Sequence, residues 1–486
     1  MKIAVIGSGI GGLASACRLA AKGHEVTVFE KNATPGGKMS EINMGGYRFD
    51  TGPSLFTLPE LVEELYDAAG ESIPSDFNYK KLEVLCKYFY NSGENIIAWS
   101  DQEKFTQECV EKVGEDPANI SNYLKKASVI YKLTADIFLF NSLHKAKNLF
   151  KFSVLKSLLQ VSKIRFYKTM HRDNLSNFKS AQLVQLFDRY ATYNGSSPYQ
   201  APATLNVIAH LENNLGAYFP DRGMYSIIKH MYTLALKKGV TFHFNTLVSS
   251  IDIENKKAIG LKSGNQSFYF DKIVSDSDVN YVVNNMMDHP LKKRFNRLEP
   301  SSSALVFYWG IRKEFPNLDL HNILFSADYK EEFNSLFRDK KLDKDPTIYI
   351  FVSSKVVKTD APENCENWFV MVNAPSNSKE NWDDLVRTSR QTIINKINRR
   401  LNTTIENYIE HEKIASPLTI EQNTLSKGGA LYGNSSNSMF SAFLRHPNFL
   451  NSVKDLYFVG GSVHPGGGIP LCLASAKIID NEIPAI

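Results

Sequence analysis

Cysteine is scarce in this sequence, and the few cysteines are scattered. The 486 residues contain five of them, and no two form a Cys-x-x-Cys pair. Zinc sites, redox dithiols and disulfide frameworks need cysteines at short or regular spacings, so the sequence predicts no metal site and no disulfide. A reducing, cytosolic setting fits this pattern best.

Long uninterrupted apolar runs are also missing. The most apolar helix candidate, at residues 129–140, is interrupted by Lys132 and Asp136. No segment reaches the roughly 20 apolar residues that a helix needs to span a bilayer. The first residues lead directly into a strand pattern that a glycine turn ends, which is not the pattern of a signal peptide. We therefore expect a cytoplasmic protein whose contact with membranes is peripheral.

An excess of one charge is absent overall but present locally. The 56 Lys and Arg residues against 51 Asp and Glu residues give a formal charge of +5, which does not indicate a nucleic-acid partner. Residues 143–180, however, contain nine Lys or Arg residues and one acid, Asp173. A basic amphipathic helix here would be typical of a membrane-surface element, and a solvated helix over its own core is the alternative. The apolar face of this helix would consist of Phe152, Leu155, Leu159 and Phe166. Its basic face would carry Lys156 and Lys163.

The first thirty residues carry a complete dinucleotide-binding pattern. A strand pattern at residues 3–6 leads into the glycines, helix periodicity follows, and a second strand pattern ends on Glu30. Gly7 permits a tight turn, Gly9 lets backbone approach a pyrophosphate, and Gly12 lets helix and strand pack closely. The helix N-terminus offers free N–H groups to phosphates, and Glu30 can accept hydrogen bonds from a ribose.

Further glycine clusters indicate FAD rather than NAD. Pro35-Gly-Gly-Lys38 and the stretch 45–54 follow Glu30, where an NAD dehydrogenase needs no second glycine pair. Near the other end, a strand pattern runs into Gly460-Gly461, and the stretch 466–470 leads into a helix. Glycine lets backbone lie against a cofactor where a side chain would collide, and the helix dipole would stabilise negative charge on a bound group.

In this order the motifs resemble the FAD superfamily of amine oxidases, protoporphyrinogen oxidases and carotenoid desaturases. Gly-x-x-x-His-Pro-Gly-x-Gly-Ile-Pro at residues 460–470 is similar to the signature of bacterial-type phytoene desaturases, and the resemblance covers essentially the whole chain. The stretches 218–224 and 271–278 also resemble family segments, although Arg222 replaces a glycine. Residues 187–202 resemble the branch that desaturates hydroxylated or methoxylated carotenoids at the 3,4 bond.

The resemblance implies an α/β fold with two domains. A Rossmann-like FAD-binding domain is expected from residues 1–80, 215–289 and 431–486. A substrate domain with a mixed sheet and helices is expected from residues 81–214 and 290–430. Because the sequence has no second G-x-G-x-x-G motif, no NADPH domain is expected, and reducing equivalents are expected to pass to oxygen or a membrane quinone.

The resemblance also implies the residues of the site. Asp188, Tyr190, Tyr193 and Asn194 are the candidates for contact with a substrate hydroxyl or for proton removal, and a structural turn is the alternative for this stretch. Non-covalent FAD is expected to contact Gly7, Gly9, Ile10, Gly11, Gly12, Glu30, Lys31, Gly37, Lys38, Gly52, Pro53, Ser54, Val248, Gly460, Gly461, Gly467, Gly468 and Ile469.

The implied reaction is desaturation of a long apolar carotenoid by hydride transfer to flavin N5 and loss of a proton. The branch resemblance narrows it to 3,4-desaturation of a 1-hydroxylated end group, as in 1'-hydroxy-gamma-carotene. Phytoene desaturation and carotene isomerisation are alternatives. A prenyl-binding escort protein of the same fold, without redox chemistry, is an alternative of another class.

Overall fold

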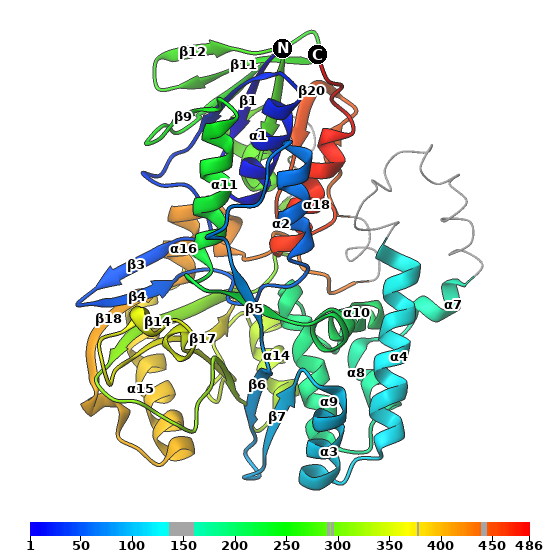
Figure 1. Ribbon diagram of the computed structural model, residues 1–486, viewed down its shortest axis with the longest axis vertical. Helices are drawn as coiled ribbons and strands as arrows, with labels where there is room; N and C mark the ends of the chain where they lie inside the picture. Colours follow the sequence, from blue (N-terminus) through cyan, green and yellow to red (C-terminus); the bar gives the residue numbers. More distant parts are fainter. Residues whose placement is uncertain (136–159, 289–291, 293–295, 377–378, 439–444) are drawn as a thin grey trace.

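Two β-sheets organise the chain, one in the upper half and one in the lower half of Figure 1. The computed structural model describes residues 1–135, 160–288, 292, 296–376, 379–438 and 445–486. The first sheet has nine strands in the order β10-β11-β20-β13-β1-β2-β9, with β12 beside β11 and β19 beside β20. The strands are β1 (Lys2–Ile6), β2 (Glu25–Phe29), β9 (Thr241–His243), β10 (Ser250–Glu254), β11 (Lys257–Ser263), β12 (Gln266–Tyr269), β13 (Lys272–Ser275), β19 (Phe449–Leu450) and β20 (Val453–Phe458).

Strand β1 lies inside the parallel part of this sheet, between β13 and β2. All of its residues after Lys2 are buried, as expected for a parallel strand that is covered on both faces. On one face Ala4 and Ile6 pack with Leu261 of β11. Three helices pack together on the other face in Figure 1, namely α1 (Ile10–Ala21), α11 (Tyr225–Lys237) and α18 (Ile469–Asp480).

The second sheet is mixed and has seven strands in the order β18-β14-β17-β16-β15-β6-β7. Its longest pairing is antiparallel and runs from Ser303 opposite Ala374 to Ile311 opposite Glu366. The strands are β6 (Val84–Phe89), β7 (Asn95–Trp99), β14 (Ser303–Ile311), β15 (His321–Leu324), β16 (Ile348–Phe351), β17 (Glu366–Ala374) and β18 (Ile409–Ala415).

The two faces of the second sheet differ in what they contact. Trp309 and Trp368 point to one face and pack with Ile393 of α15 (Trp382–Leu401) in a buried cluster. Val306 and Tyr308, which alternate with the residues of that cluster along β14, line a cavity on the opposite face. Period-two alternation along β14 therefore separates a closed core from the wall of a binding site.

The remaining elements are helices and short strands outside the two large sheets. Several helices lie at the lower right of Figure 1 and others join the two sheets. The helices are α2 (Glu60–Ala68), α3 (Gln102–Val113), α4 (Pro117–Thr134), α7 (Val161–Ile164), α8 (Met170–Leu175), α9 (Ala181–Asp188), α10 (Val207–Ala209), α12 (Val279–Tyr281), α14 (Tyr329–Phe337) and α16 (Pro417–Thr424). The short strands are β3 (Glu41–Met44), β4 (Tyr47–Asp50), β5 (Tyr79–Lys81) and β8 (Tyr218–Pro220).

The α/β fold class expected from the sequence is confirmed, with a Rossmann-like parallel sheet and a separate mixed sheet. Residues 136–159, which hold most of the expected amphipathic helix, including Phe152, Leu155, Lys156 and Leu159, lie outside the described residues. Among the helices that the structure describes, none is both long enough and apolar enough to cross a bilayer.

Candidate functional site

A cavity of about 970 Å³ is lined by residues of both sheets and of the helices around them. At one end its wall consists of the loops that follow β1, β2 and β20. At the other end the wall is formed by apolar side chains of β14, β15 and β17 and of the segment 204–212. One continuous space therefore joins a polar, glycine-rich end to an apolar end.

The turn between β1 and α1 forms the glycine-rich end. Gly7 has φ +91° and begins the turn, and an added Cβ at Gly12 would lie 2.2 Å from the carbonyl oxygen of Gly7. Helix α1 therefore packs directly on the turn. The N-cap residue Gly9 offers no side-chain cap and the first turn of α1 contains no acid, but the carboxyl of Asp276 accepts hydrogen bonds from the Gly9 and Gly12 N–H groups at this helix end. The N-terminus of α1 is therefore a position that attracts negative charge.

The two ends of the chain meet at this turn. An added Cβ at Gly11 would lie 2.8 Å from the backbone nitrogen of Gly460, the first residue of the glycine pair that follows β20. The N–H of Gly460 donates a 2.9 Å hydrogen bond to Ser475 Oγ of α18. An added Cβ at Gly460 would in turn lie 2.1 Å from a carboxylate oxygen of Asp276. The segments 7–12 and 460–469 therefore form one wall.

Glu30 lies at the end of β2 and is held beside the same turn. Its carboxylate accepts hydrogen bonds from the Ser8 N–H at 2.9 Å and the Ser8 hydroxyl at 2.8 Å, and from the Asn32 N–H at 2.8 Å. The side chain is buried yet lines the cavity. A carboxylate in this position can still accept hydrogen bonds from the hydroxyls of a bound ribose.

Sixteen of the eighteen residues expected to contact FAD line the cavity, and Gly12 and Gly460 lie behind its wall. Lys38 Nζ donates to the carbonyl oxygens of Ala430 and Leu431 at 2.9 and 2.7 Å, and burial lowers its pKa. Lys31 Nζ donates to the carbonyl oxygen of Gln422 at 2.9 Å. The N-terminus of α1, the glycine contacts and Glu30 fit the pyrophosphate and ribose of FAD, and their role stays a proposal.

The apolar end is formed largely by side chains without charge. They come from the inward face of the second sheet and from the helical segment before β8. The main ones are Leu85, Leu205, Ile208, Leu211, Val306, Ile323, Phe369 and Met371.

A buried polar cluster interrupts this apolar wall. Arg189, Tyr193 and Glu212 line the cavity and bond to one another. The Tyr193 hydroxyl lies 3.1 Å from Arg189 Nη1 and donates to Glu212 at 2.7 Å, and Arg189 Nη2 donates to the Tyr88 hydroxyl at 2.8 Å. The pairing of Arg189 with Glu212 compensates both charges where water is scarce.

Only two of the four candidate catalytic residues line the cavity. Tyr193 and Asn194 line the cavity, whereas Asp188 and Tyr190 are not among its lining residues. The buried Asp188 carboxylate bonds to His171 Nδ1 at 2.6 Å and thereby fixes α8 against α9, and burial raises its pKa. The Tyr190 hydroxyl donates to Glu212 at 3.0 Å from behind the wall.

Sequence reasoning missed several polar residues of the site. Arg189 is the only cation of the stretch 187–202 but is not among the expected site residues, and Glu212 lies outside the motifs named above. Asp276, in the segment after β13, packs on the glycine turn, and burial raises its pKa to about 7. Burial lowers the pKa of Arg445 to about 10, and its guanidinium donates to the carbonyl oxygen of Tyr432 at 2.9 Å. No sequence spacing predicts these positions, because they depend on tertiary contacts.

The fold and the site define a flavin-dependent oxidoreductase. Residues 10–478 match the family described as flavin containing amine oxidoreductase. The chain belongs to this family and, within it, to the carotenoid desaturases, and its cofactor is FAD. The thiol of Cys472 lies on the cavity wall with a pKa that burial raises to about 12, which fits the expectation of non-covalent binding.

Relatives with curated names support this assignment over the whole length. The chain is 46% identical to the 1-hydroxycarotenoid 3,4-desaturase of Flavobacterium sp., with 99% of each chain covered. It is 30% identical to the 4,4'-diapolycopene oxygenase of Methylomonas sp., with 100% of this chain and 98% of that protein covered. The structure of cyclohexylamine oxidase from Brevibacterium oxydans has the same fold, with a TM-score of 0.61 at 14% identity and 99% of both chains covered.

The His, Cys, Asp and Glu side chains of the described residues are the potential ligands for a metal ion. Among the residues that the structure describes, no group of three or more His, Cys, Asp or Glu side chains could hold a metal ion.

Proposed function

We propose that this chain is an FAD-dependent carotenoid desaturase that introduces a C=C bond at the 3,4 position of a 1-hydroxylated end group. The observation that carries the proposal is the full-length identity of 46% with a 1-hydroxycarotenoid 3,4-desaturase. The cavity supports it, because one space joins the glycine-rich end to an apolar wall. Phytoene desaturation or isomerisation would use the same two ends but another substrate or product.

We propose that two sets of discontinuous segments bind the cofactor and the substrate, respectively. Residues 1–80, 215–289 and 431–486 supply every strand of the first sheet and would bind FAD. Residues 81–214 and 290–430 supply every strand of the second sheet and would bind the carotenoid. The eighteen cofactor residues, including Gly9, Glu30 and Val248, would hold the dinucleotide along the first part.

Apolar burial would supply most of the substrate affinity. A carotenoid end group has few or no polar atoms, so binding depends on apolar area removed from water, at about 25 cal/mol per Å². The carotenoid would contact Leu211, Ile323 and Phe369, and these side chains would exclude water from its reacting carbons. Bound FAD supplies the hydride acceptor for oxidation of a C–H bond. The wall residues select which of several similar C–H bonds faces it.

Polar groups in this wall would fix the position of the substrate along the cavity. Tyr193 and Asn194 remain candidates for contact with a substrate hydroxyl or for proton removal, because both line the cavity. Asp188 and Tyr190 would act through the packing of α9 and of the Arg189 cluster. Oxygen or a membrane quinone is proposed as the terminal electron acceptor.

The proposed reaction is tested with the FAD-loaded protein and defined carotenoids. A 1-hydroxylated acyclic carotenoid should lose two hydrogens, as measured by mass spectrometry, and the product should absorb at longer wavelength. Conversion of phytoene alone would contradict the 3,4-desaturase assignment, and a product of unchanged formula would indicate isomerisation.

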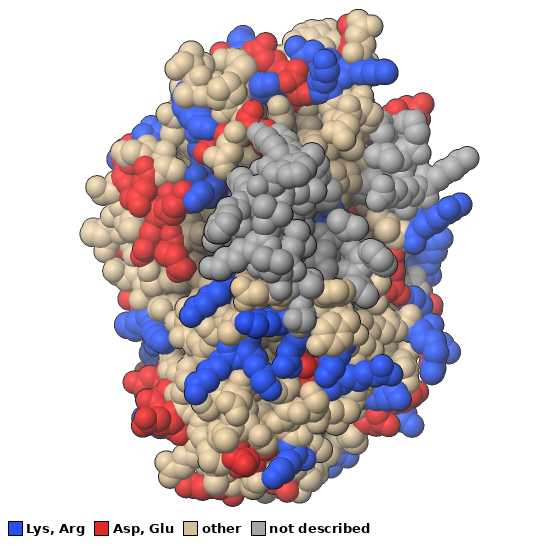
Figure 2. All heavy atoms as spheres, turned by 90° about the vertical axis from the view of Figure 1, so that its right-hand side faces the viewer, with Lys and Arg blue, Asp and Glu red and all other residues tan. Residues whose placement is uncertain are grey.

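We also propose that the protein docks on anionic membranes through the face that carries α7 and α8. Lys and Arg side chains gather on this face in Figure 2. The exposed residues Lys163, Lys168 and Arg172 lie in the same short segment as Tyr167 and Leu175, which are 58% and 55% exposed. Basic residues beside exposed apolar side chains are typical of a membrane-surface element.

Charge reversal tests this docking. Each basic residue near an anionic surface contributes about 1 kcal/mol, so the double variant Lys168→Glu and Arg172→Glu should weaken binding to phosphatidylserine vesicles by roughly 30-fold or more. Arg387→Glu with Arg399→Glu on α15, at the lower left of Figure 1, is the matched control and should float with vesicles as the unmodified protein does. Equal flotation of both variants would show that the protein does not dock on membranes through this face.

A further inference from the structure

His321 begins β15 and is a buried polar residue on the apolar side of the cavity. It is 4% exposed, and it lines the cavity with Ile323 and Phe369. Its Nδ1 lies 2.8 Å from the hydroxyl of Tyr349 on the neighbouring strand β16. Among the described residues, its Nε2 has no hydrogen-bond partner. An unsatisfied ring nitrogen in an apolar wall is costly unless a ligand satisfies it.

Neighbouring residues fix the position of this imidazole. The ring stacks on Phe351, with centroids 5.4 Å apart and an angle of 17° between the planes. The Tyr349 hydroxyl is itself held, because it lies 2.6 Å from Ser54 Oγ. Stacking and the hydrogen bond at Nδ1 hold the ring in place and leave Nε2 as its unpaired nitrogen within the described part of the chain.

The charge state of His321 suits an uncharged ligand. Burial, with a smaller effect of the nearby Arg189, lowers the pKa of His321 to about 3, so the imidazole is neutral at physiological pH. A neutral imidazole can donate or accept a hydrogen bond with an alcohol and places no charge beside an apolar chain.

The position of His321 also agrees with the chemistry of the end group. Hydrogen bonds of 2.6 and 2.8 Å link Ser54, one of the proposed FAD contacts, through Tyr349 to His321. In a 1-hydroxylated end group, the carbon that bears the hydroxyl is two carbons away from the nearer carbon of the 3,4 bond. A group that recognises this hydroxyl must therefore lie close to the cofactor.

Tyr193 is less suited to this role. Its hydroxyl already bonds to Arg189 and Glu212, so a substrate hydroxyl would have to compete with a charge-assisted pair. His321 Nε2 has no such competitor among the described residues.

We propose that His321 recognises the 1-hydroxyl group of the substrate and sets the preference for hydroxylated over unsubstituted carotenoids. The inference rests on the proposed function and adds a specificity-determining residue to it. A substrate with the hydroxyl satisfies Nε2, whereas the parent carotene leaves it buried and unpaired, which disfavours the parent by at least about tenfold.

The test compares two substrates on FAD-loaded variants. The probes are a 1-hydroxylated acyclic carotenoid and its unsubstituted parent, presented in the same liposomes. His321→Leu should lower the ratio of the two kcat/KM values at least tenfold, because the hydroxylated substrate loses its hydrogen bond and the parent no longer leaves a ring nitrogen unpaired. His321→Gln keeps a hydrogen-bonding group and should retain most of the ratio. His210→Leu, at a buried histidine that is not among the cavity-lining residues, is the control and should leave the ratio unchanged.

Each outcome distinguishes the inference from the proposed function. An unchanged ratio in an active His321→Leu variant, or an equal loss on both substrates, would overturn the role of His321 alone. Failure of the unmodified FAD-loaded protein to convert either substrate would overturn the proposed function. If His321→Leu does not fold, Tyr349→Phe replaces it, because loss of the bond to Nδ1 should lower the ratio. A wild-type ratio in an active Tyr349→Phe variant would then refute the inference.

Discussion

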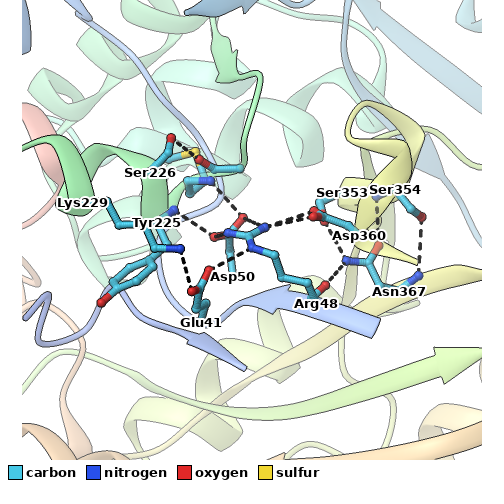
Figure 3. Close-up of polar contacts among 12 residues, drawn as sticks. Glu41, Arg48, Asp50, Tyr225, Ser226, Lys229, Ser353, Ser354, Asp360 and Asn367 are labelled. Atoms are coloured by element: carbon cyan, nitrogen blue, oxygen red, sulfur yellow. Dashed lines mark hydrogen bonds and ion pairs between the residues drawn. The ribbon is translucent and has the colours of Figure 1, made fainter. Parts of the chain in front are cut away.

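The guanidinium of Arg48 and the carboxylate of Asp360 lie 3.1 Å apart, and this ion pair joins β4 to the segment before β17. Arg48 also donates to Asp50 at 2.7 Å and to Glu41 at 2.9 Å (Figure 3). Asp50 in turn accepts a 2.9 Å hydrogen bond from the backbone N–H of Tyr225, at the start of α11. One network therefore connects a helix beside the first sheet with β17 of the second sheet, since Ser353 donates to Asp360 and Asn367 of β17 donates to Ser353.

Arg48→Met should destabilise the fold strongly. The side chains of Asp50 and Asp360 are 1% and 2% exposed, so the variant leaves two buried carboxylates without their cation. Removal of one partner from a buried ion pair costs about 3–5 kcal/mol. The free energy of unfolding in urea measures this loss.

Arg222→Met is the matched control for that loss. Arg222 pairs with Asp76 at 2.9 Å, but the side chains are 66% and 48% exposed. An exposed pair contributes at most about 1 kcal/mol. Equal losses in the two variants would show that the Arg48 network does not depend on burial.

Gly12→Ala should prevent FAD binding by changing the β1–α1 turn. The new Cβ would lie 2.2 Å from the carbonyl oxygen of Gly7, and both groups belong to the backbone, so neither can rotate away. We expect a yellow wild-type protein and a colourless or insoluble variant, as measured by absorbance at the flavin band per mole of purified protein.

Gly114→Ala separates this steric effect from the general cost of replacing glycine. Gly114 follows α3 with φ +64°, and an added Cβ would meet no atom within 4 Å. This variant should lose about 1 kcal/mol of stability and bind a full equivalent of FAD. Full FAD content in Gly12→Ala would contradict the proposed cradle.

The sequence predicted the parts of this molecule that local patterns encode. The strand patterns at residues 3–6 and 26–29 correspond to β1 and β2, and the late strand and helix correspond to β20 and α18. These segments were predictable because glycine clusters and buried apolar runs are local signals.

The apolar end of the site was not predictable in the same way. Arg189 and Glu212 are separated by a turn and two short helical segments, and only the fold pairs them. His321 is an unremarkable residue in the sequence, and its unpaired nitrogen becomes visible only when β15, β16 and Ser54 are brought together. Asp188 was expected in the site because it lies in the stretch 187–202, but it bonds to His171 and does not line the cavity.

Glu30→Gln should weaken FAD binding while the fold is retained. Hydrogen bonds to a charged acceptor contribute about 1.5–3 kcal/mol, so loss of the carboxylate should raise the Kd of FAD roughly 10- to 100-fold. Titration of the cofactor-free protein by flavin fluorescence measures the Kd. Glu25→Gln, on the same strand with a side chain 69% exposed, should leave it unchanged. An unchanged Kd in Glu30→Gln would show that Glu30 does not bind the cofactor and only stabilises the turn at Ser8.

Asp276 should make the cofactor-free protein less stable as the pH rises. Burial raises the pKa of this carboxyl from 3.8 to about 7, although the N–H groups of Gly12 and Gly9 lower it. The unfolded chain therefore releases the proton near pH 4 and the folded protein only near pH 7, so the contribution of Asp276 to stability is full below pH 4 and declines as the pH rises to 7. Between pH 5 and pH 8 this decline is about 2–3 kcal/mol. Asp276→Asn cannot ionise, so its stability relative to wild type should increase by that amount over this range in urea unfolding, and a difference that stays constant with pH would show that Asp276 is ionised throughout.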